Sequence, residues 1–182
     1  IGLEDEHFKS VTSYDQMLLK RWFYEMFSNY EFLLITQTDV VIFRDELNEW
    51  IKKDYDYIGA PWIIKRKSGQ EKYYVGNGGI SLRKVISFMK SLDKLKILRC
   101  PKWYLESKNV PNFFMSFAQY SFGFNKFVFF SKTHEDFFWS QLIPSTNYDF
   151  KVASAGESFK FAIEKFREED ISNFLTNIPF AI

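Results

Sequence analysis

The stretch FLLITQTDVVIF, Phe32 to Phe43, is a run of apolar residues with one polar interruption, at Gln37, Thr38 and Asp39. An ionised carboxylate inside such a run must find a partner or lose its solvation, and even a neutral polar group then loses roughly 2–7 kcal/mol. The first five residues, FLLIT, are typical of a buried strand that ends just before the polar residues. The interruption therefore makes Asp39 a candidate functional residue at the end of a strand.

The composition predicts one domain, residues 1–182, because a chain of this length with 46% hydrophobic residues can bury one core. The 24 basic and 23 acidic residues nearly cancel and form no blocks, so a nucleic-acid partner is not expected. The single cysteine, Cys100, favours a reducing, cytoplasmic location. The first ten residues do not resemble a signal peptide, and no apolar window approaches the roughly 20 residues of a membrane span. The sequence leaves open a peripheral contact of the protein with a membrane surface.

Around the opening stretch, helical and extended patterns alternate. The segment YDYIGAPW, 55–62, predicts a strand that runs into a turn at Pro61, and YYVGNGGISLR, 73–83, predicts a strand, a glycine turn and a second strand. Helical patterns cover residues 13–27 behind a cap at Ser13, 45–53 behind a cap at Asp45, 84–96, and 133–143 behind a cap at Thr133. This order predicts an α/β fold with a mixed, mainly parallel sheet flanked by helices.

In a parallel sheet, ligands gather beyond the carboxyl ends of the strands, which is where Asp39 is expected. A carboxylate there suits a hard divalent cation, Mg²⁺ or Mn²⁺, or a ribose hydroxyl. One carboxylate cannot fill an octahedral shell, so substrate phosphates and a second protein ligand would have to contribute. The alternative is an aspartate that caps a turn and binds no ligand.

The segment VGNGGISLR lacks side chains at Gly76, Gly78 and Gly79, which would let a flat, hydroxyl-rich ligand lie against the backbone. Asn77 adds a donor and an acceptor of hydrogen bonds. The spacing does not match the dinucleotide-binding G-x-G-x-x-G pattern, and a glycine turn without a ligand is the alternative.

The segment HEDFF places Glu135 and Asp136 in the first turn of a predicted helix. The helix dipole keeps carboxylates there ionised, as a general base requires, although such residues also serve as ordinary helix-end charges. His134 is expected at the surface or behind a ligand and not as a metal ligand, because His7 is the only other histidine.

Several segments, in their order and approximate spacing, resemble a family of bacterial glycosyltransferase-like domains of unknown function, which itself looks like the GT-A fold. The similarity runs from about Tyr14 to Pro179. Its segments are YDQMLLKRWFYEMFSNYEFLLITQTDVVIF, DYDYIGAPW, YYVGNGGISLR, HEDFFWSQL and FKFAIE. The resemblance implies a GT-A-like sheet. GT-A domains begin with a nucleotide-binding strand, whereas this chain begins with a helical pattern. The hypothesis that the chain is a fragment of a longer one, without that first strand, therefore stays open.

The resemblance also implies a glycosyltransferase that uses a nucleoside diphosphate sugar. Asp39 stands at the last aspartate of the metal-binding D-x-D motif, and Asp136 matches the base that ends the x-E-D motif of inverting enzymes. Gln37 stands where the first aspartate would be, so binding of Mn²⁺ or Mg²⁺ is expected to be weaker or to depend on other groups. Gln37, Thr38 and Asp39 would bind the donor, and Glu135 would help Asp136.

On this hypothesis, Asp136 takes the proton from a hydroxyl of a saccharide or glycoconjugate acceptor. A single displacement then inverts the configuration at the anomeric carbon of the transferred sugar. Trp62 would stack on a sugar or base face, while Asn77, Gly78 and Gly79 would shape the acceptor side. For Trp62, a core or lid aromatic is the alternative. A noncatalytic carbohydrate-binding or scaffolding domain is the competing function. A hydrolase is disfavoured because no recognised motif places a second acid near Asp136.

Overall fold

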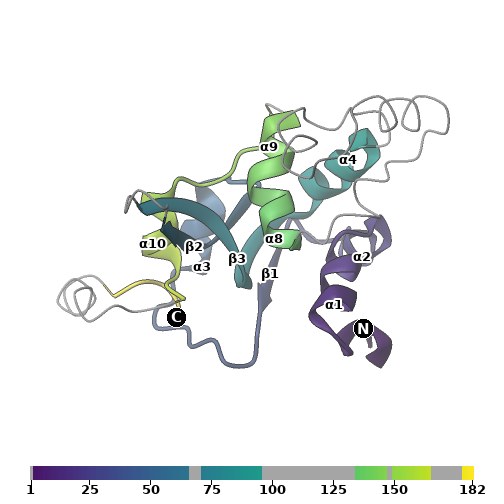
Figure 1. Ribbon diagram of the computed structural model, residues 1–182, viewed down its shortest axis with the longest axis horizontal. Coiled ribbons are helices and arrows are strands. Elements are labelled where there is room, and N and C mark those ends of the chain that lie inside the picture. The colour runs from purple at the N-terminus through teal and green to yellow at the C-terminus, as the bar shows by residue number, and fades with distance from the viewer. Residues whose placement is uncertain (1, 66–70, 96–133, 147–148, 165–177) are drawn as a thin grey trace.

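The computed structural model describes residues 2–65, 71–95, 134–146, 149–164 and 178–182. A sheet lies in the middle, with helices on both of its faces (Figure 1). The elements are η1 (Asp5–Phe8), α1 (Val11–Leu18), α2 (Arg21–Glu25), β1 (Phe32–Thr36), α3 (Leu47–Lys52), β2 (Tyr57–Lys65), β3 (Glu71–Lys84), α4 (Val85–Leu95), α8 (Glu135–Phe137), the π-helical η2 (Phe138–Leu142), α9 (Ile143–Thr146) and α10 (Ala155–Phe161).

The sheet of the described residues has three strands in the order β1-β3-β2, and both pairs are antiparallel. The mainly parallel, GT-A-like sheet expected from the sequence is therefore wrong. Only residues 66–70 separate β2 from β3, whereas a parallel crossover needs a dozen or more residues. Helices cover both faces of this sheet, so its strands contribute apolar residues to a core on each face, and composition does not reveal strand direction.

The glycine segment is not a turn between two strands, as the sequence suggested, because β3 runs through it from Glu71 to Lys84. The pairing of β2 with β3 shifts register on both sides of Ala60, opposite this segment. The glycines thus accommodate an irregularity inside one long strand. Pro61 does not end β2 either, and proline is tolerated there because β2 is an edge strand.

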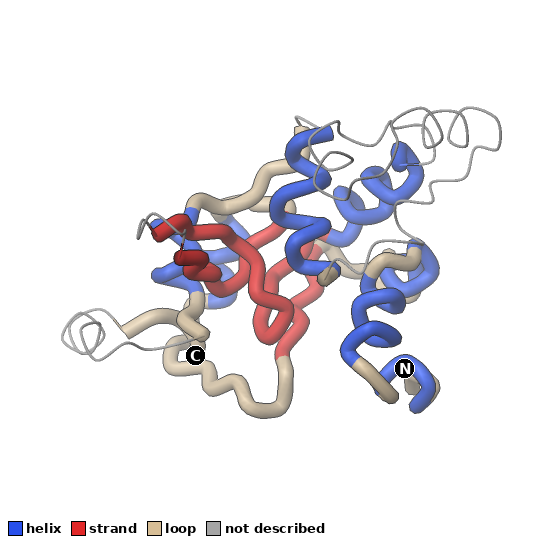
Figure 2. The backbone as a smooth tube through the Cα atoms, viewed as in Figure 1, coloured by secondary structure: helices blue, strands red, loops and turns tan. Residues whose placement is uncertain are grey.

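Alternate residues of the strands point into two separate cores, and the central strands in Figure 2 lie between the helices that complete them. Ile80 and Leu82 of β3 belong to the core completed by α3 and α10. Tyr57 of β2 belongs to the other core, completed by α1, α2, α4, η2 and α9. The side chains of Ser81 and Arg83, between and after those apolar residues, are fully buried. Side chains alternate between the two faces of the sheet along β3. This alternation places Arg83 on the face that α8 covers.

Sequence patterns located most helices but misplaced some of their ends. The strand predicted for FLLIT is confirmed as β1, although its residues are half-buried or exposed and not buried as predicted, and the helix predicted for 84–96 is confirmed as α4. The helix predicted for 13–27 is interrupted between α1 and α2. Its cap is Ser10, and Ser13 is the third residue of the helix, where it completes a capping box. No side-chain cap starts α3, and Thr133 lies outside the described residues.

Among the described helices, none combines the length and the apolar character needed to cross a membrane.

Gly76 is expected to be intolerant of any side chain. Its φ of +111° is one that L-residues rarely adopt, and a Cβ atom there would lie 2.8 Å from Cε1 of Tyr57 and 2.9 Å from Cβ of Ser140. Gly76→Ala should lower the free energy of unfolding by about 2–4 kcal/mol, because strain and overpacking each cost about 1–3 kcal/mol. Urea unfolding measures the loss.

Gly156→Ala in α10 is the matched control, because the added Cβ would have as its nearest neighbour Ser154 Oγ at 3.9 Å. Alanine also favours a helix over glycine by about 1 kcal/mol, so this variant should lose no stability. If Gly76→Ala unfolds at the same urea concentration as the parent, the backbone at Gly76 is not strained.

Candidate functional site

A cleft of about 650 Å³ opens between the end of β1, the η1–α1 region and the start of α8. Its volume lies within the usual range of small-molecule sites. It is lined by Phe8, Ser10, Val11, Tyr14, Asp15, Thr36, Gln37, Thr38, Asp39, Gly79, His134, Glu135 and Asp136.

This cleft brings together the two acidic segments that the sequence singled out. Gln37, Thr38 and Asp39 follow β1, while Glu135 and Asp136 begin α8, and all five line the same cleft. The antiparallel pairing of β1 with the second half of β3 is what places the polar end of β1 beside the glycine segment.

Gly79 joins the two predicted binding segments directly. Its carbonyl accepts a hydrogen bond from the backbone N–H of Gln37 at 2.8 Å, and Gly79 itself lines the cleft. It therefore lies next to the residues predicted for the donor, on the side of the cleft where β1 ends.

The other residues predicted for the acceptor are not among those that line this cleft. Trp62 is half-buried in β2, where it pairs with Tyr74 of β3. Asn77 pairs with Ala60, and Gly78 follows it within β3, but the surroundings of their side-chain positions lie outside the described part of the structure. Their role in acceptor binding stays a prediction.

Asp39 is exposed in the cleft, so an ion can reach its carboxylate. Three described side chains that could share a metal ion are Glu4, Glu6 and His7, at the surface near η1 and outside the lining of the cleft. Asp39 belongs to no such group within the described residues. One carboxylate would hold Mg²⁺ or Mn²⁺ only with substrate phosphates and a second protein ligand to complete the shell.

Glu135 forms a buried ion pair with Arg83 of β3. The side chains are 2% and 0% exposed, and the guanidinium binds both carboxylate oxygens, at 2.8 Å and 3.0 Å. Arg83 also donates to the Ser81 hydroxyl at 2.9 Å and to the Tyr24 hydroxyl at 2.9 Å. The carboxylate of Glu135 is thus committed to Arg83, and this pair joins α8 to the sheet.

Burial and the partner charge act in opposite directions on the pKa of both groups. Burial raises the pKa of the Glu135 carboxyl, and Arg83 opposes that rise. Burial tends to lower the pKa of Arg83, but Glu135, Tyr24 and Tyr57 together outweigh it and hold the pKa of Arg83 well above its ordinary value. Arg83 is therefore charged, and the bidentate geometry matches an ionised Glu135.

Asp136 lies beside this pair but faces a different environment. It is 7% exposed and lines the cleft, and its Oδ1 accepts the backbone N–H of Phe137 at 2.6 Å. A ligand in the cleft can therefore reach a carboxylate whose position is held by its own helix. That combination suits a general base more than the carboxylate of Glu135 does, because both oxygens of Glu135 bind Arg83.

The structure adds a pair that sequence reasoning missed. Nδ1 of His134 lies 3.1 Å from Oδ2 of Asp15, and both residues line the cleft. Burial raises the pKa of the Asp15 carboxyl, and His134 and a backbone hydrogen bond with Glu135 oppose the rise. The two residues are 119 positions apart, so no local pattern could have joined them.

The electrostatics of the cleft are acidic. Asp15, Asp39, Glu135 and Asp136 line it, and Arg83 compensates Glu135 from behind. Within the described lining, no lysine or arginine occurs and His134 is the basic side chain. An anionic ligand would therefore need added positive charge to bind here.

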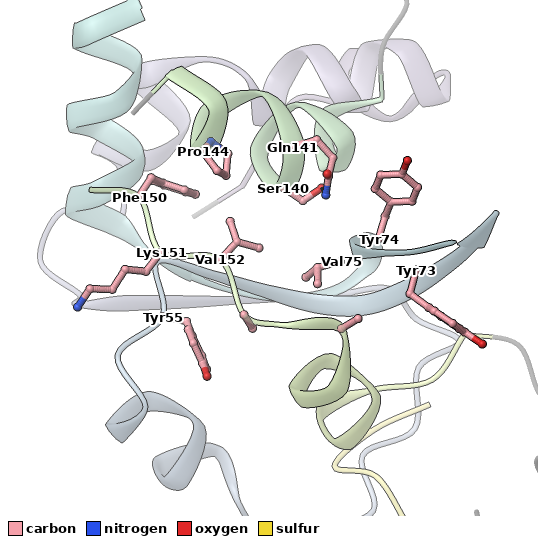
Figure 3. Close-up of a pocket in the computed structure, with 12 residues that line it drawn as sticks. Tyr55, Tyr73, Tyr74, Val75, Ser140, Gln141, Pro144, Phe150, Lys151 and Val152 are labelled. Carbon is pink, nitrogen blue, oxygen red and sulfur yellow. The ribbon is translucent and has the colours of Figure 1, made fainter. Parts of the chain in front are cut away.

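A second cavity, of about 550 Å³, lies between β3 and the η2–α9 segment. Figure 3 shows Val75 and Val152 directed toward its middle, with Ser140 and Gln141 above them. None of the residues predicted for the donor, acceptor, base or metal lines it, whereas the residues predicted for the donor and the base line the first cleft.

Comparison with known proteins identifies the family without assigning an activity. Neither the curated proteins nor the solved structures include a match to this chain. One family model matches residues 1–182, which is the entire chain. The chain belongs to the family described as "Protein of unknown function (DUF5672)".

Proposed function

We propose that this chain transfers a sugar from a nucleoside diphosphate sugar to a hydroxyl of a saccharide or glycoconjugate acceptor. One observation carries the proposal: the segment Gln37–Asp39 and the pair Glu135 and Asp136 line one cleft of small-molecule size. These are the positions that the resemblance described above assigns to donor binding and to the base.

The donor would lie with its diphosphate near Asp39. Because the cleft is acidic and its described lining has no lysine or arginine, a diphosphate would be repelled without a cation. Mg²⁺ or Mn²⁺ bound by Asp39 and the phosphates would supply the charge that stabilises the leaving group. The absence of a second aspartate at Gln37 makes the phosphates essential to that site.

The acceptor hydroxyl would lie against Asp136. Its oxygen bonds to the anomeric carbon from the face opposite the diphosphate, the bond between that carbon and the phosphate oxygen breaks, and the hydroxyl proton passes to Asp136. A single displacement of this kind inverts the anomeric configuration. Glu135 would act indirectly, because its bond to Arg83 holds the start of α8 and hence Asp136.

The proposal includes a cytoplasmic location and no nucleic-acid partner. The single cysteine and the balanced charge of +1 support these two points.

A noncatalytic carbohydrate-binding domain is the second candidate. It is favoured by the segment Gln37–Asp39, which supplies one carboxylate where a metal-dependent transferase would have two, since Gln37 replaces the first aspartate. Carboxylates also accept hydrogen bonds from sugar hydroxyls without any donor nucleotide. Release of nucleoside diphosphate from a labelled sugar nucleotide, in the presence of acceptor and Mn²⁺, supports the transferase. Saccharide binding without turnover supports the second candidate.

Asp39→Asn should weaken Mn²⁺-dependent binding of a nucleoside diphosphate by about tenfold or more, equivalent to about 1.4 kcal/mol. The amide keeps the size of the side chain but removes the charge that the cation requires, and the exposed position should leave the fold intact. Calorimetric titration with uridine diphosphate, with and without Mn²⁺, measures the change.

Asp45→Asn is the control, because Asp45 is also exposed but is not among the residues lining the cleft. It should bind uridine diphosphate as the parent does. Equal affinity of Asp39→Asn and the parent, with Mn²⁺ present, would show that Asp39 only shapes the turn after β1.

A further inference from the structure

His134 has the geometry of a histidine held for contact with a ligand. Its side chain is 60% exposed and lines the cleft, while the carboxylate of Asp15 beside it is only 17% exposed. The hydrogen bond described for His134 uses Nδ1, so Nε2 is the ring nitrogen that can contact a ligand. A carboxylate on one ring nitrogen orients the other.

The charge of the cleft shows which ligand chemistry would use this geometry. Asp39 and Asp136 are acidic, Arg83 is bound to Glu135, and the basic side chain in the described lining is His134. A diphosphate brings further negative charge into this site. A metal ion on the single carboxylate of Asp39 compensates only part of it, so a second cation would improve binding.

We propose that the imidazolium form of His134, oriented by Asp15, donates a hydrogen bond from Nε2 to a diphosphate oxygen of the donor. This inference rests on the proposed function. It adds a contact between His134 and the diphosphate that the proposed function does not include. Asp15 then has two tasks, because it holds Nδ1 of His134 and accepts a backbone hydrogen bond from Glu135.

Acidic side chains line the cleft beside the imidazole. Asp15 on α1 and Glu135 and Asp136 on α8 belong to this lining, and Arg83 binds Glu135 from behind. Asp15 is in contact, with its Oδ2 atom 3.1 Å from Nδ1 of His134. A histidine that donates to a carboxylate from Nδ1 and to a phosphate from Nε2 carries both ring protons.

In the competing role, a neutral His134 takes the proton from the acceptor hydroxyl. A lysine at this position distinguishes this role from the proposed contact with the diphosphate. His134→Lys keeps a positive charge near the diphosphate but cannot replace a neutral imidazole as the base at pH 7. His134→Gln keeps a side-chain amide and removes the charge. Because the side chain is mostly exposed, both variants should fold, which the melting temperature checks.

The experiment measures binding of inorganic pyrophosphate to the chain 1–182 by calorimetry, with and without Mg²⁺. Pyrophosphate carries the group common to all nucleoside diphosphate sugars and no acceptor chemistry. At pH 6, His134→Gln should bind it about tenfold less tightly than the parent, and His134→Lys should retain most of the affinity. His7→Gln is the control, because His7 packs on Trp22 and does not line the cleft.

Two outcomes would overturn the inference in distinguishable ways. If the parent binds pyrophosphate and His134→Gln binds it equally at pH 6, the contact with His134 is absent and the proposed function is untouched. If the parent does not bind pyrophosphate or uridine diphosphate with or without Mg²⁺, the donor site itself is absent, and the proposed function fails together with this inference.

Discussion

Asp136→Asn is expected to reduce the rate of sugar transfer by about 10²–10⁴-fold, because a positioned general base contributes about that factor. The amide has the same shape as the carboxylate but takes up no proton at neutral pH. Its carbonyl oxygen can still accept the backbone N–H of Phe137, which Asp136 Oδ1 accepts at 2.6 Å. Donor affinity and melting temperature should therefore change little.

The rate is measured with a labelled sugar nucleotide, and donor binding is assayed separately. Asp149→Asn is the control, because Asp149 is exposed and does not line the cleft; it should transfer at the parental rate. A normal rate in Asp136→Asn would remove Asp136 from the chemistry. A similar small loss in both variants would mean that only helix-end or surface charge had been changed.

Arg83→Met is expected to lower the free energy of unfolding by about 3–5 kcal/mol, because it leaves the buried carboxylate of Glu135 without its partner. The hydroxyls of Ser81 and Tyr24 also lose the guanidinium that donates to them. Native domains have only about 5–15 kcal/mol of stability, so the loss is a large fraction of the whole. Urea unfolding followed by circular dichroism measures it.

The double variant Arg83→Met with Glu135→Leu tests whether the lost partner is the cause. Removing both charges leaves neither one buried alone, so the double variant should be more stable than Arg83→Met by several kcal/mol. Lys52→Met is the control, because the Lys52–Glu49 pair is exposed on α3 and contributes little. If the double variant is no more stable than Arg83→Met, packing of the long arginine side chain matters more than the charge pair.

The Arg83–Glu135 pair also separates the two carboxylates at the start of α8. In the sequence, Glu135 and Asp136 are adjacent acids in one helical turn, and only the resemblance favoured Asp136 as the base. In the structure, both oxygens of Glu135 bind Arg83, whereas Asp136 faces the cleft. Arg83 lies 52 positions away from Glu135, so only the folded chain shows that the carboxylate of Glu135 is paired with Arg83.

The sequence by itself determined part of the local structure and pointed to polar residues that line the cleft. The run FLLIT had to form a strand, because five successive apolar and β-branched residues suit a buried extended segment. The periodicity of residues 84–96 likewise determined α4. The interruption at Asp39 and the acids at the start of α8 stood out because polar groups beside apolar runs are costly unless they bind something.

Only the tertiary structure decided strand direction, the partners of the acids and the shape of the cleft. The sheet is antiparallel because the link between β2 and β3 is short and because β1 and β3 run in opposite directions. Neither the apolar character nor the side-chain period of a strand encodes its direction. The pair of Asp15 with His134 joins residues 119 apart. Such contacts depend on how whole elements pack around the two cores, and no local sequence pattern carries that information.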